Sequence, residues 1–501
     1  MHRWLAVLLV ASLAGTAFPA DVSDERGSAA TGVLEHHGGG GRSGMFVVPS
    51  LTFERARNLH LDPAFHADVA GPVYAQPLYW RAPGSNKALL LVATEQNFVY
   101  ALDAATGAVV WRTSLGAPMP HAALPCGNID PLGITGTPVI DERSQTLYVG
   151  ALVKGQTAAT HKIFALSLKD GTALSGWPLD VEAELTASGK SFRSTVQNQR
   201  GALTIVHDTL YVPYGGHFGD CGDYHGWVVG ASLQRPHAIH AWSTRARGGG
   251  IWAPGGIASD GLSIYAVTGN TFGARSWADG EAVIRLGLDL SFSGKPQDFF
   301  APSDWQELDT TDSDLGGTGA LPLSLPGAKP AELVLALGKD GKAYLLDREN
   351  LGGVGGSVLA KKVSSSPIRT APASFSSGNE IRVAFQGGGV GCPDGSSGDL
   401  TVIAIAAAAP PTLRVAWCAA ENGRGSPIVT TTDGKANPIV WAVGAEGDNR
   451  LHGFRGDTGT VVFSGGGPGN AMSQVRRFQT LIAAGDRLYI AGDQHVYAFA
   501  F

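Results

Sequence analysis

The sequence has little charge and no extended helical pattern. Asp, Glu, Lys and Arg make up 16% of its 501 residues, and the formal net charge is −6. Because Lys and Arg nowhere form a run, we expect neither nucleic acid nor an anionic membrane as a partner. Beyond the first twenty residues, no stretch keeps the 3.6-residue apolar period of a long helix, which favours a fold of short strands and turns.

Short catalytic motifs are also missing. The chain contains no Gly-x-Ser-x-Gly elbow and no glycine-rich phosphate loop, which are signatures of serine hydrolases and nucleotide-binding enzymes. It has no Cys-x-x-Cys-His motif for covalent haem, and none of its four cysteines are neighbours. The repeat pattern of the chain is therefore the main guide to its fold and function.

Glycine, by contrast, is abundant, with 69 residues that mark repeated strands and turns. The clearest unit is Leu90–Gly116, in which three strand-like runs are joined by turn-forming residues. Across its last two runs it carries the pattern Ala101-x-Asp103-x3-Gly107-x3-Trp111. One such small sheet cannot bury both of its faces, so the pattern requires further copies along the chain.

Partial copies of the pattern follow in order. They are Ala165…Gly171…Trp177, Ala231…Trp242, Ala404…Trp417 and Gly453…Gly459…Phe463. Eight strand starts, each marked by a pair of residues that are mostly small or proline, are spaced roughly 50–65 residues apart. These pairs are Gln76-Pro77, Thr137-Pro138, Gly201-Ala202, Gly255-Gly256, Gly319-Ala320, Ala371-Pro372, Ser426-Pro427 and Gln479-Thr480.

The pattern resembles the tryptophan-docking repeat of pyrroloquinoline-quinone (PQQ) type propellers. That family includes quinoprotein alcohol dehydrogenases and non-catalytic outer-membrane assembly propellers, and the repeats cover roughly residues 50–501. The resemblance implies an all-β, eight-bladed propeller of four-stranded antiparallel blades. The last blade, Tyr489–Phe501, lacks its outer strand. We predict that a segment before Pro72, around Leu51–His66, supplies that strand and closes the ring.

The chain divides into three predicted segments. Met1–Ala20 has a basic start, an apolar core and small residues at its end, which is typical of a secretory signal peptide. Asp21–Gly44 is rich in Gly and Ser and is predicted to be a flexible lead-in. Residues 45–501 are predicted to form one propeller domain. We therefore expect an exported monomer, periplasmic or extracellular, without a transmembrane segment.

Four cysteines in an exported chain suggest two disulfides. In a four-stranded blade, the loop between the second and third strands and the link to the next blade emerge on the same face. Cys126 lies in such a link and Cys221 in such a loop, while Cys392 and Cys418 occupy comparable places in blade six. This predicts the pairs Cys126–Cys221 and Cys392–Cys418, with free buried thiols as the alternative.

The same face gathers polar loops around the propeller axis, where we expect the ligand site. Its densest cluster includes His217, Asp220, Asp223 and His225, whose imidazoles and carboxylates are potential metal ligands. Their spacing matches no regular zinc motif, so hydrogen bonds within the loop are the favoured interpretation. Further ligand candidates on this face are Arg200 and Arg369.

The resemblance to quinoprotein dehydrogenases implies a more specific site in blades four and five. Trp252 resembles the tryptophan on which the quinone stacks, and Lys339 the basic residue that contacts its carbonyls. Asn270 follows a Thr-Gly step, as the calcium-ligating Asn does. Glu281, or less favourably Asp279, falls near the catalytic aspartate that accepts the substrate proton. PQQ and calcium are the implied cofactors.

Departures from the dehydrogenases decide which function we predict. The disulfide of adjacent cysteines is absent, and the metal-ligating glutamate of blade three has at best a displaced substitute in Asp220. We therefore predict a non-catalytic module that binds a protein, glycan or small molecule on its funnel. A PQQ- and calcium-dependent dehydrogenase of alcohols or sugars is the alternative. Hydrolase or lyase chemistry ranks last, because the His and Asp residues complete no triad.

Overall fold

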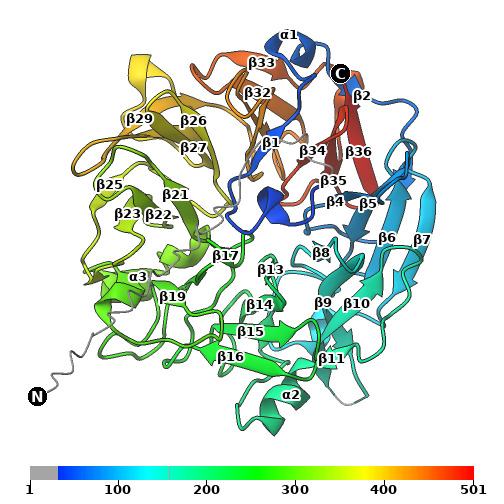
Figure 1. Ribbon diagram of the computed structural model, residues 1–501, viewed down its shortest axis with the longest axis vertical. Coiled ribbons are helices and arrows are strands. Elements are labelled where there is room, and N and C mark those ends of the chain that lie inside the picture. The colour runs from blue at the N-terminus through cyan, green and yellow to red at the C-terminus, as the bar shows by residue number, and fades with distance from the viewer. Residues whose placement is uncertain (1–31, 157) are drawn as a thin grey trace, which may run out of the picture.

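Eight antiparallel sheets surround a common axis in the computed structural model, which describes residues 32–156 and 158–501 (Figure 1). The main strands of each blade, four in blades one to seven and three in blade eight, follow one another in chain order from the axis to the rim. The predicted all-β, eight-bladed propeller is confirmed. In the described ranges, no helix is long and apolar enough to cross a membrane. The predicted signal peptide, residues 1–20, lies outside those ranges.

The first four blades each begin with an inner strand one or two residues after a predicted strand start. Blade one contains β4 (Leu78–Arg81), β5 (Ala88–Ala93), β6 (Phe98–Asp103) and β7 (Val109–Ser114); blade two contains β8 (Val139–Asp141), β9 (Thr146–Lys154), β10 (Ala159–Ser167) and β11 (Leu179–Asp180). Blade three contains β13 (Thr204–Val206), β14 (Thr209–Gly216), β15 (Trp227–Ser232) and β16 (Ile239–Ser243), with β12 (Gln197–Asn198) also on β14; blade four contains β17 (Ala258–Ser259), β18 (Ile264–Val267), β19 (Val283–Leu286) and β20 (Phe299–Ala301), extended by β24 (Gly353–Val354).

The remaining blades follow the same order. Blade five contains β21 (Leu321–Ser324), β22 (Glu332–Leu337), β23 (Lys342–Asp347) and β25 (Leu359–Lys362); blade six contains β26 (Ala373–Ser377), β27 (Glu380–Gln386), β28 (Leu400–Ala406) and β29 (Thr412–Ala419). Blade seven contains β30 (Ile428–Thr431), β31 (Ile439–Val443), β32 (Leu451–Arg455) and β33 (Val461–Ser464), and blade eight contains β34 (Ile482–Ala484), β35 (Arg487–Ala491) and β36 (His495–Ala500). Three short helices, α1 (Phe53–Ala56), α2 (Val181–Ala187) and α3 (Trp305–Thr311), lie in the connections.

The N-terminal part of the propeller closes the ring at blade eight. Two short strands, β2 (His60–Leu61) and β3 (Ala67–Asp68), pair antiparallel with β36 at the rim, close to the C-terminus (Figure 1). This confirms that a segment before Pro72 completes the last blade. The added strands cover the outer edge of β36, which would otherwise present unpaired backbone groups.

The repeated tryptophans form the seams between consecutive blades. Trp111 is 8% exposed, and its indole N–H donates to the carbonyl of Leu168 in blade two at 3.0 Å. A β-carbon added to Gly171 would lie 2.5 Å from the indole, so only glycine lets the ring lie this close. Trp417 docks in the same way on blade seven, donating to Gly456 at 2.9 Å. The Gly and Trp of the repeat therefore meet across each of these seams.

The described part of the predicted flexible lead-in is built into the centre of the ring. Val33 exchanges two backbone hydrogen bonds with Tyr79 of blade one, and the carbonyl of Gly40 accepts from Ser259 of blade four. The next strand, β1 (Met45–Val47), pairs parallel with β30 of blade seven. Residues 32–44, which the sequence analysis includes in a flexible lead-in, thus hydrogen-bond to several blades. The glycines allow close packing: a β-carbon at Gly44 would lie 2.9 Å from that of Ala373.

Buried polar side chains anchor this axial segment. Arg42 donates to the carbonyls of Ile257 and Leu203, both at 2.9 Å, and forms an ion pair with Glu35 at 3.3 Å. The His36 and His37 rings are buried and stacked 4.5 Å apart. Burial lowers the pKa of His37 to about 3, so its imidazole is neutral at physiological pH. Residues 33–48 thereby join several blades across the axis.

Candidate functional site

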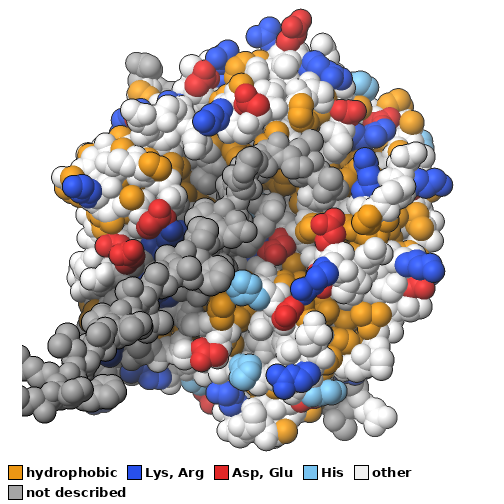
Figure 2. All heavy atoms as spheres, viewed as in Figure 1, with side chains coloured by type: hydrophobic (Ala, Val, Ile, Leu, Met, Phe, Trp, Pro, Cys, Tyr) orange, Lys and Arg blue, Asp and Glu red, His pale blue; other side chains and the backbone are white. Residues whose placement is uncertain are grey.

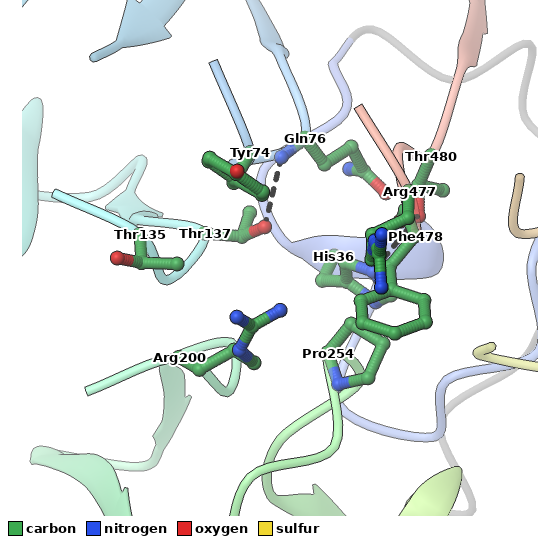
Figure 3. Close-up of a pocket in the computed structure, with 10 residues that line it drawn as sticks. All are labelled: His36, Tyr74, Gln76, Thr135, Thr137, Arg200, Pro254, Arg477, Phe478 and Thr480. Atoms are coloured by element: carbon green, nitrogen blue, oxygen red, sulfur yellow. Dashed lines mark hydrogen bonds between the residues drawn. The ribbon is translucent and has the colours of Figure 1, made fainter. Parts of the chain in front are cut away.

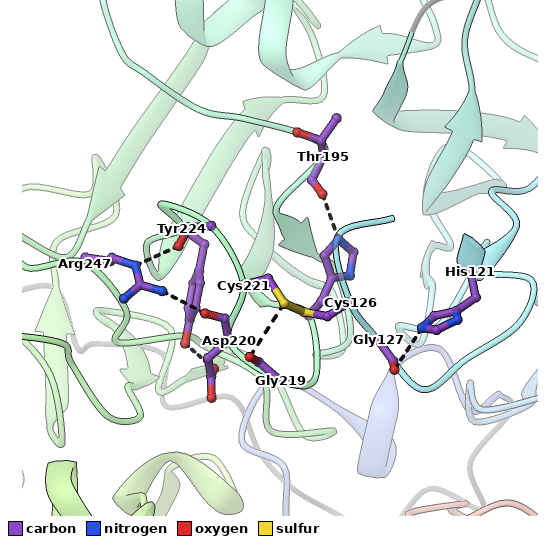
Figure 4. Close-up of a disulfide and its surroundings, with 11 residues drawn as sticks. His121, Cys126, Gly127, Thr195, Gly219, Asp220, Cys221, Tyr224 and Arg247 are labelled. Atoms are coloured by element: carbon purple, nitrogen blue, oxygen red, sulfur yellow. Dashed lines mark hydrogen bonds between the residues drawn. A yellow bond between two sulfur atoms is a disulfide. The ribbon is translucent and has the colours of Figure 1, made fainter. Parts of the chain in front are cut away.

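One end of the ring carries the second-to-third-strand loops and the links between blades, and we call it the funnel face. Both disulfides lie on it, as Cys126–Cys221 and Cys392–Cys418, which confirms the predicted pairing. The first of them ties the link before blade two to the loop of blade three (Figure 4). Two long irregular segments are thereby held together over blade two.

The His and Asp cluster beside this disulfide is engaged within its own loops. The imidazole of His217 hydrogen-bonds the carbonyl of Thr195 at 3.1 Å, and that of His225 the carbonyl of Thr244 at 2.9 Å. Asp220 accepts from the hydroxyl of Tyr224 at 2.6 Å. Asp223 is exposed. Within residues 32–156 and 158–501, no group of three or more His, Cys, Asp or Glu side chains is arranged to hold a metal ion.

Blades four and five bring Trp252, Asp314 and Lys339 into direct contact. The half-buried Trp252 donates its indole N–H to Asp314 Oδ2 at 2.8 Å. Lys339 Nζ lies 3.0 Å from the same Oδ2 and 5.1 Å from the centre of the indole ring. It also contacts Asp312 at 2.7 Å. Burial alone would lower the pKa of Lys339, but the two aspartates raise it overall, so the ammonium stays charged.

Glu281 lies next to this group as a second buried carboxyl. Its Oε2 accepts the backbone N–H of Leu315 at 2.6 Å, while Glu281 Oε1 and Asp314 Oδ1 are buried without a hydrogen-bond partner among the described residues. Burial raises the pKa of Glu281 well above its usual range, and the charge of Asp314 raises it further. Burial also raises the pKa of Asp314, against the opposing effect of Lys339. The two carboxyls therefore resist carrying two negative charges together.

The other predicted residues of blade four take different roles. Asp279 is buried and forms a two-pronged ion pair with Arg245, with both N–O distances 2.8 Å. Its carboxylate therefore has a structural role, as the partner of Arg245. Asn270 is 7% exposed, and its carbonyl accepts the N–H of Gly249 at 2.7 Å. No hydrogen bond among the described residues joins Asn270 to Asp220, the other suggested metal ligand.

A small pocket lies on the axis above the buried N-terminal segment (Figure 3). Its volume is about 10 Å³, which is room for roughly one water molecule. Arg200 points into it and lies 5.8 Å from the ring centre of Tyr74 and 5.5 Å from that of Phe478. His36 and several hydroxyl groups complete the wall. A flat tricyclic cofactor does not fit in this pocket.

A larger hollow of about 390 Å³ lies beside α3 and reaches Lys339. Its lining is polar and consists of hydroxyl, carboxylate and ammonium groups, including Thr311, Ser313, Ser365 and Lys342. Lys342 is paired with Asp304 at 2.8 Å. The volume lies in the range of small-ligand sites. Elsewhere, charges of both signs alternate without a single basic field over the face seen in Figure 2.

Comparison with known families identifies the repeat. The PQQ_2 family model, described as outer membrane protein assembly factor BamB, matches residues 65–218. Together with the eight blades, this match confirms the resemblance drawn from the sequence. The chain is an eight-bladed propeller, and the PQQ-repeat model matches one part of it, residues 65–218. No curated protein matches it in sequence.

Solved structures share its fold. A quinohemoprotein alcohol dehydrogenase from Pseudomonas putida HK5 is 13% identical, with 94% of this chain and 80% of that chain covered and a TM-score of 0.65. A europium-containing methanol dehydrogenase has the same identity and TM-score, with 94% and 98% covered. The quinohemoprotein alcohol dehydrogenase of Comamonas testosteroni is also 13% identical, with 94% and 81% covered and a TM-score of 0.61. At this identity the similarity shows the fold alone.

Sequence reasoning missed the central member of the blade-four and blade-five cluster. Asp314 is not among the site residues predicted from the sequence, yet it contacts both Trp252 and Lys339. Its position just before the inner strand of blade five, beside two glycines, is the signal that could have distinguished it. Tyr74 and Phe478, the aromatic neighbours of Arg200, belong to no sequence motif that would have predicted this contact.

Proposed function

We propose that this protein is an exported binding module that takes a polar ligand, a segment of a protein or a glycan, on its funnel face. One combined observation carries this proposal: the polar hollow beside α3 is open, whereas the ring of Trp252 is covered by a neighbouring side chain. Lys339 lies over the face of Trp252, where a flat cofactor would stack, while the hollow of about 390 Å³ stays accessible. Binding without a redox cofactor suits this arrangement.

Export is supported by the two disulfides. Disulfides persist in oxidising compartments such as the periplasm or the cell exterior. Both lie on the funnel face, where they hold long loops in place around the proposed binding surface. We therefore place the protein outside the cytoplasm. Cell fractionation with an antibody to the full chain tests this, and accumulation in the reduced cytosol would contradict it.

A photo-crosslinking experiment tests the binding function. Benzoylphenylalanine is placed at Thr311, an exposed residue that lines the hollow, and as a control at Leu262, which is 81% exposed on the opposite face. In cells that express the full chain, we expect a discrete crosslinked species from Thr311 and none of the same mass from Leu262. Identical products from both positions, or none from Thr311 and no hit on a glycan array, would refute the proposal.

The contacts that join Trp252, Glu281, Asp314 and Lys339 favour a second candidate function, a cation- and quinone-dependent oxidoreductase. The unpartnered oxygens of Glu281 and Asp314 suit a hard cation, which prefers carboxylate ligands. A bound quinone would supply the acceptor for a substrate hydride. The quinone does not fit the present arrangement, because Lys339 lies against the Trp252 ring. No catalytic step is therefore derived through it.

Titration with PQQ separates the two candidates. Because one fold relative is described as europium-containing, the titration is done with calcium and in parallel with europium. Cofactor absorbance and tryptophan fluorescence are followed in the wild type and in Trp252→Phe. The binding-module proposal expects no saturable change. Saturable, cation-dependent binding that Trp252→Phe weakens would establish the oxidoreductase instead.

A further inference from the structure

Arg200 enters the axial pocket without a partner of opposite charge. Among the described residues, no carboxylate oxygen lies within 4.0 Å of its guanidinium and no hydrogen bond engages it. The head group lies between the rings of Tyr74 and Phe478 and points toward the centre of the pocket (Figure 3). A guanidinium has five N–H donors, and leaving them unpaired in a half-buried site is unfavourable.

The acids nearest to Arg200 are already engaged elsewhere. Both oxygens of the buried Glu95 accept hydrogen bonds, from the backbone of Gly133 at 2.7 Å and from the hydroxyl of Thr135 at 2.8 Å. Glu446 pairs with Arg477 at 2.7 Å. Burial raises the pKa of Glu95 to about 7, which further reduces its negative charge at neutral pH. The positive charge of Arg200 is therefore uncompensated at short range.

The rest of the pocket suits an oxygen-rich group. Gln76, Thr137 and Thr480 line it, and they bring polar side chains to the same small space. Arg477, the other cation of the wall, is the partner of Glu446 and so is not available in the way that Arg200 is. A volume of about 10 Å³ holds one oxygen-sized group. Only the end of a ligand can enter, and the remainder must lie in the funnel above.

We propose that the axial pocket binds the carboxylate or phosphate end of a ligand, with Arg200 as the residue that recognises its charge. The inference rests on the proposed binding function of the funnel face and names the chemistry of the ligand. A planar guanidinium forms two parallel hydrogen bonds to such an oxyanion. The two aromatic rings hold it in position before the ligand arrives.

A purely structural role for Arg200 makes the opposite prediction for stability. If Arg200 served to bind Tyr74 and Phe478 together, Arg200→Gln would lower the melting temperature. If its donors await a ligand, the variant melts no lower than the wild type, because an unpaired charge is removed from a half-buried site. The control is Arg193→Gln, in the same link, whose side chain is 69% exposed.

Isothermal titration of the full chain with citrate and, separately, with inorganic phosphate tests the proposal. We expect saturable binding of at least one probe to the wild type, and the preferred probe distinguishes a carboxylate from a phosphate ligand. Arg200→Gln should weaken binding at least about tenfold, and Arg193→Gln should leave it within about twofold. Equal affinity of the wild type and Arg200→Gln, or no binding of either probe to the wild type, would overturn the proposal.

A measurement on the wild type covers the case in which Arg200→Gln fails to fold. Phenylglyoxal modifies accessible arginines, and mass spectrometry reads the extent at each one. Citrate or phosphate should protect Arg200 and leave Arg193 unprotected. Equal modification of Arg200 with and without both anions overturns the inference. Loss of the Thr311 crosslink with anion protection intact would instead refute only the proposed binding module.

Discussion

Two tryptophans of this chain occupy opposite kinds of environment. Trp111 is 8% exposed, its indole N–H donates to a backbone carbonyl, and a glycine of the next blade lies against its ring. Trp252 is only half-buried, donates to the carboxylate of Asp314, and has the ammonium of Lys339 near its ring. The same side chain thus completes a blade seam in one place and lies among charges in the other.

The difference shows where stability and binding capacity lie in this propeller. At the seam, the one polar group of the indole, its N–H, donates to a backbone carbonyl. Burial of Trp111 therefore adds packing without leaving a polar group unpaired. On the funnel face, oxygens of Glu281 and Asp314 and the Nε of Arg369 are buried without a partner among the described residues. Such groups cost stability and are expected where a protein contacts something else.

The seam is tested first, with Trp111→Ala. The change removes a large buried ring and leaves a cavity between blades one and two, so we expect the free energy of unfolding to fall by about 3–5 kcal/mol. Denaturant unfolding followed by circular dichroism measures it. Val110→Ala on the same strand, at a side chain that is 54% exposed, should change stability by less than about 0.5 kcal/mol. An unchanged unfolding midpoint for Trp111→Ala would show that the seam does not carry stability.

The pH dependence of stability tests Glu95, a buried acid in the loop between β5 and β6. Burial raises the pKa of Glu95 from 4.5 to about 7 in the folded state. Because the folded protein binds this proton more tightly, its stability is full below pH 4.5 and is lost as the pH rises to about 7, by roughly 3 kcal/mol. Glu95→Gln should therefore be less stable than or equal to the wild type near pH 4.5 and more stable at pH 8. Urea melts at both pH values measure the difference; a difference that does not change with pH contradicts the assignment.

Trp252→Ala tests the second tryptophan of the comparison, the one in the candidate site. Because its ring is half-exposed and lies among charges, we expect a loss of only about 1 kcal/mol, well below that of Trp111→Ala. The two variants are compared under identical denaturant conditions. A loss equal to that of Trp111→Ala would make Trp252 a seam residue and remove it from the candidate site.

The smallest effect is expected for an ion pair at the opposite end of the ring. Arg143 and Asp208 bridge blades two and three at 2.5 Å, with side chains that are 68% and 54% exposed. Solvent screens such a pair, so Arg143→Ala should leave the melting temperature unchanged within error. Scanning calorimetry at low and high salt checks this. A salt-dependent fall in melting temperature would mean that surface charge, as well as the seams, holds the blades together.

Much of the fold was predictable because its signals are local. The eight strand starts, the Gly and Trp of the repeat and the strand missing from the last blade all lie in short windows of sequence. The pairs Cys126–Cys221 and Cys392–Cys418 then followed from the face on which their loops emerge. The packing of residues 32–44 could not be predicted in the same way. A glycine-rich segment has the same composition whether it is loose or packed closely against other parts of the chain, as these residues are.

The candidate site was predictable only in outline. Resemblance singled out Trp252 and Lys339, and the Lys339 ammonium lies over the Trp252 ring in the structure. The partner of Asp279 was not predictable, since Arg245 lies in the link before blade four and Asp279 in the loop between β18 and β19. The two residues meet only in the folded ring. Glu281 and Asp314 differ from Asp279 because no arginine of the described residues forms an ion pair with either of them.

By itself, the sequence determined the number of blades, their order and the closure of the ring, because turn residues and strand alternation act between near neighbours. Tertiary structure alone decided which charges are paired on the funnel face. Arg200 and Arg245 are both arginines in links between blades, yet Arg200 faces the axial pocket and Arg245 a buried carboxylate. That outcome depends on which loops the closed ring brings together, and the interaction energy of a charge depends on what lies within a few ångströms of it.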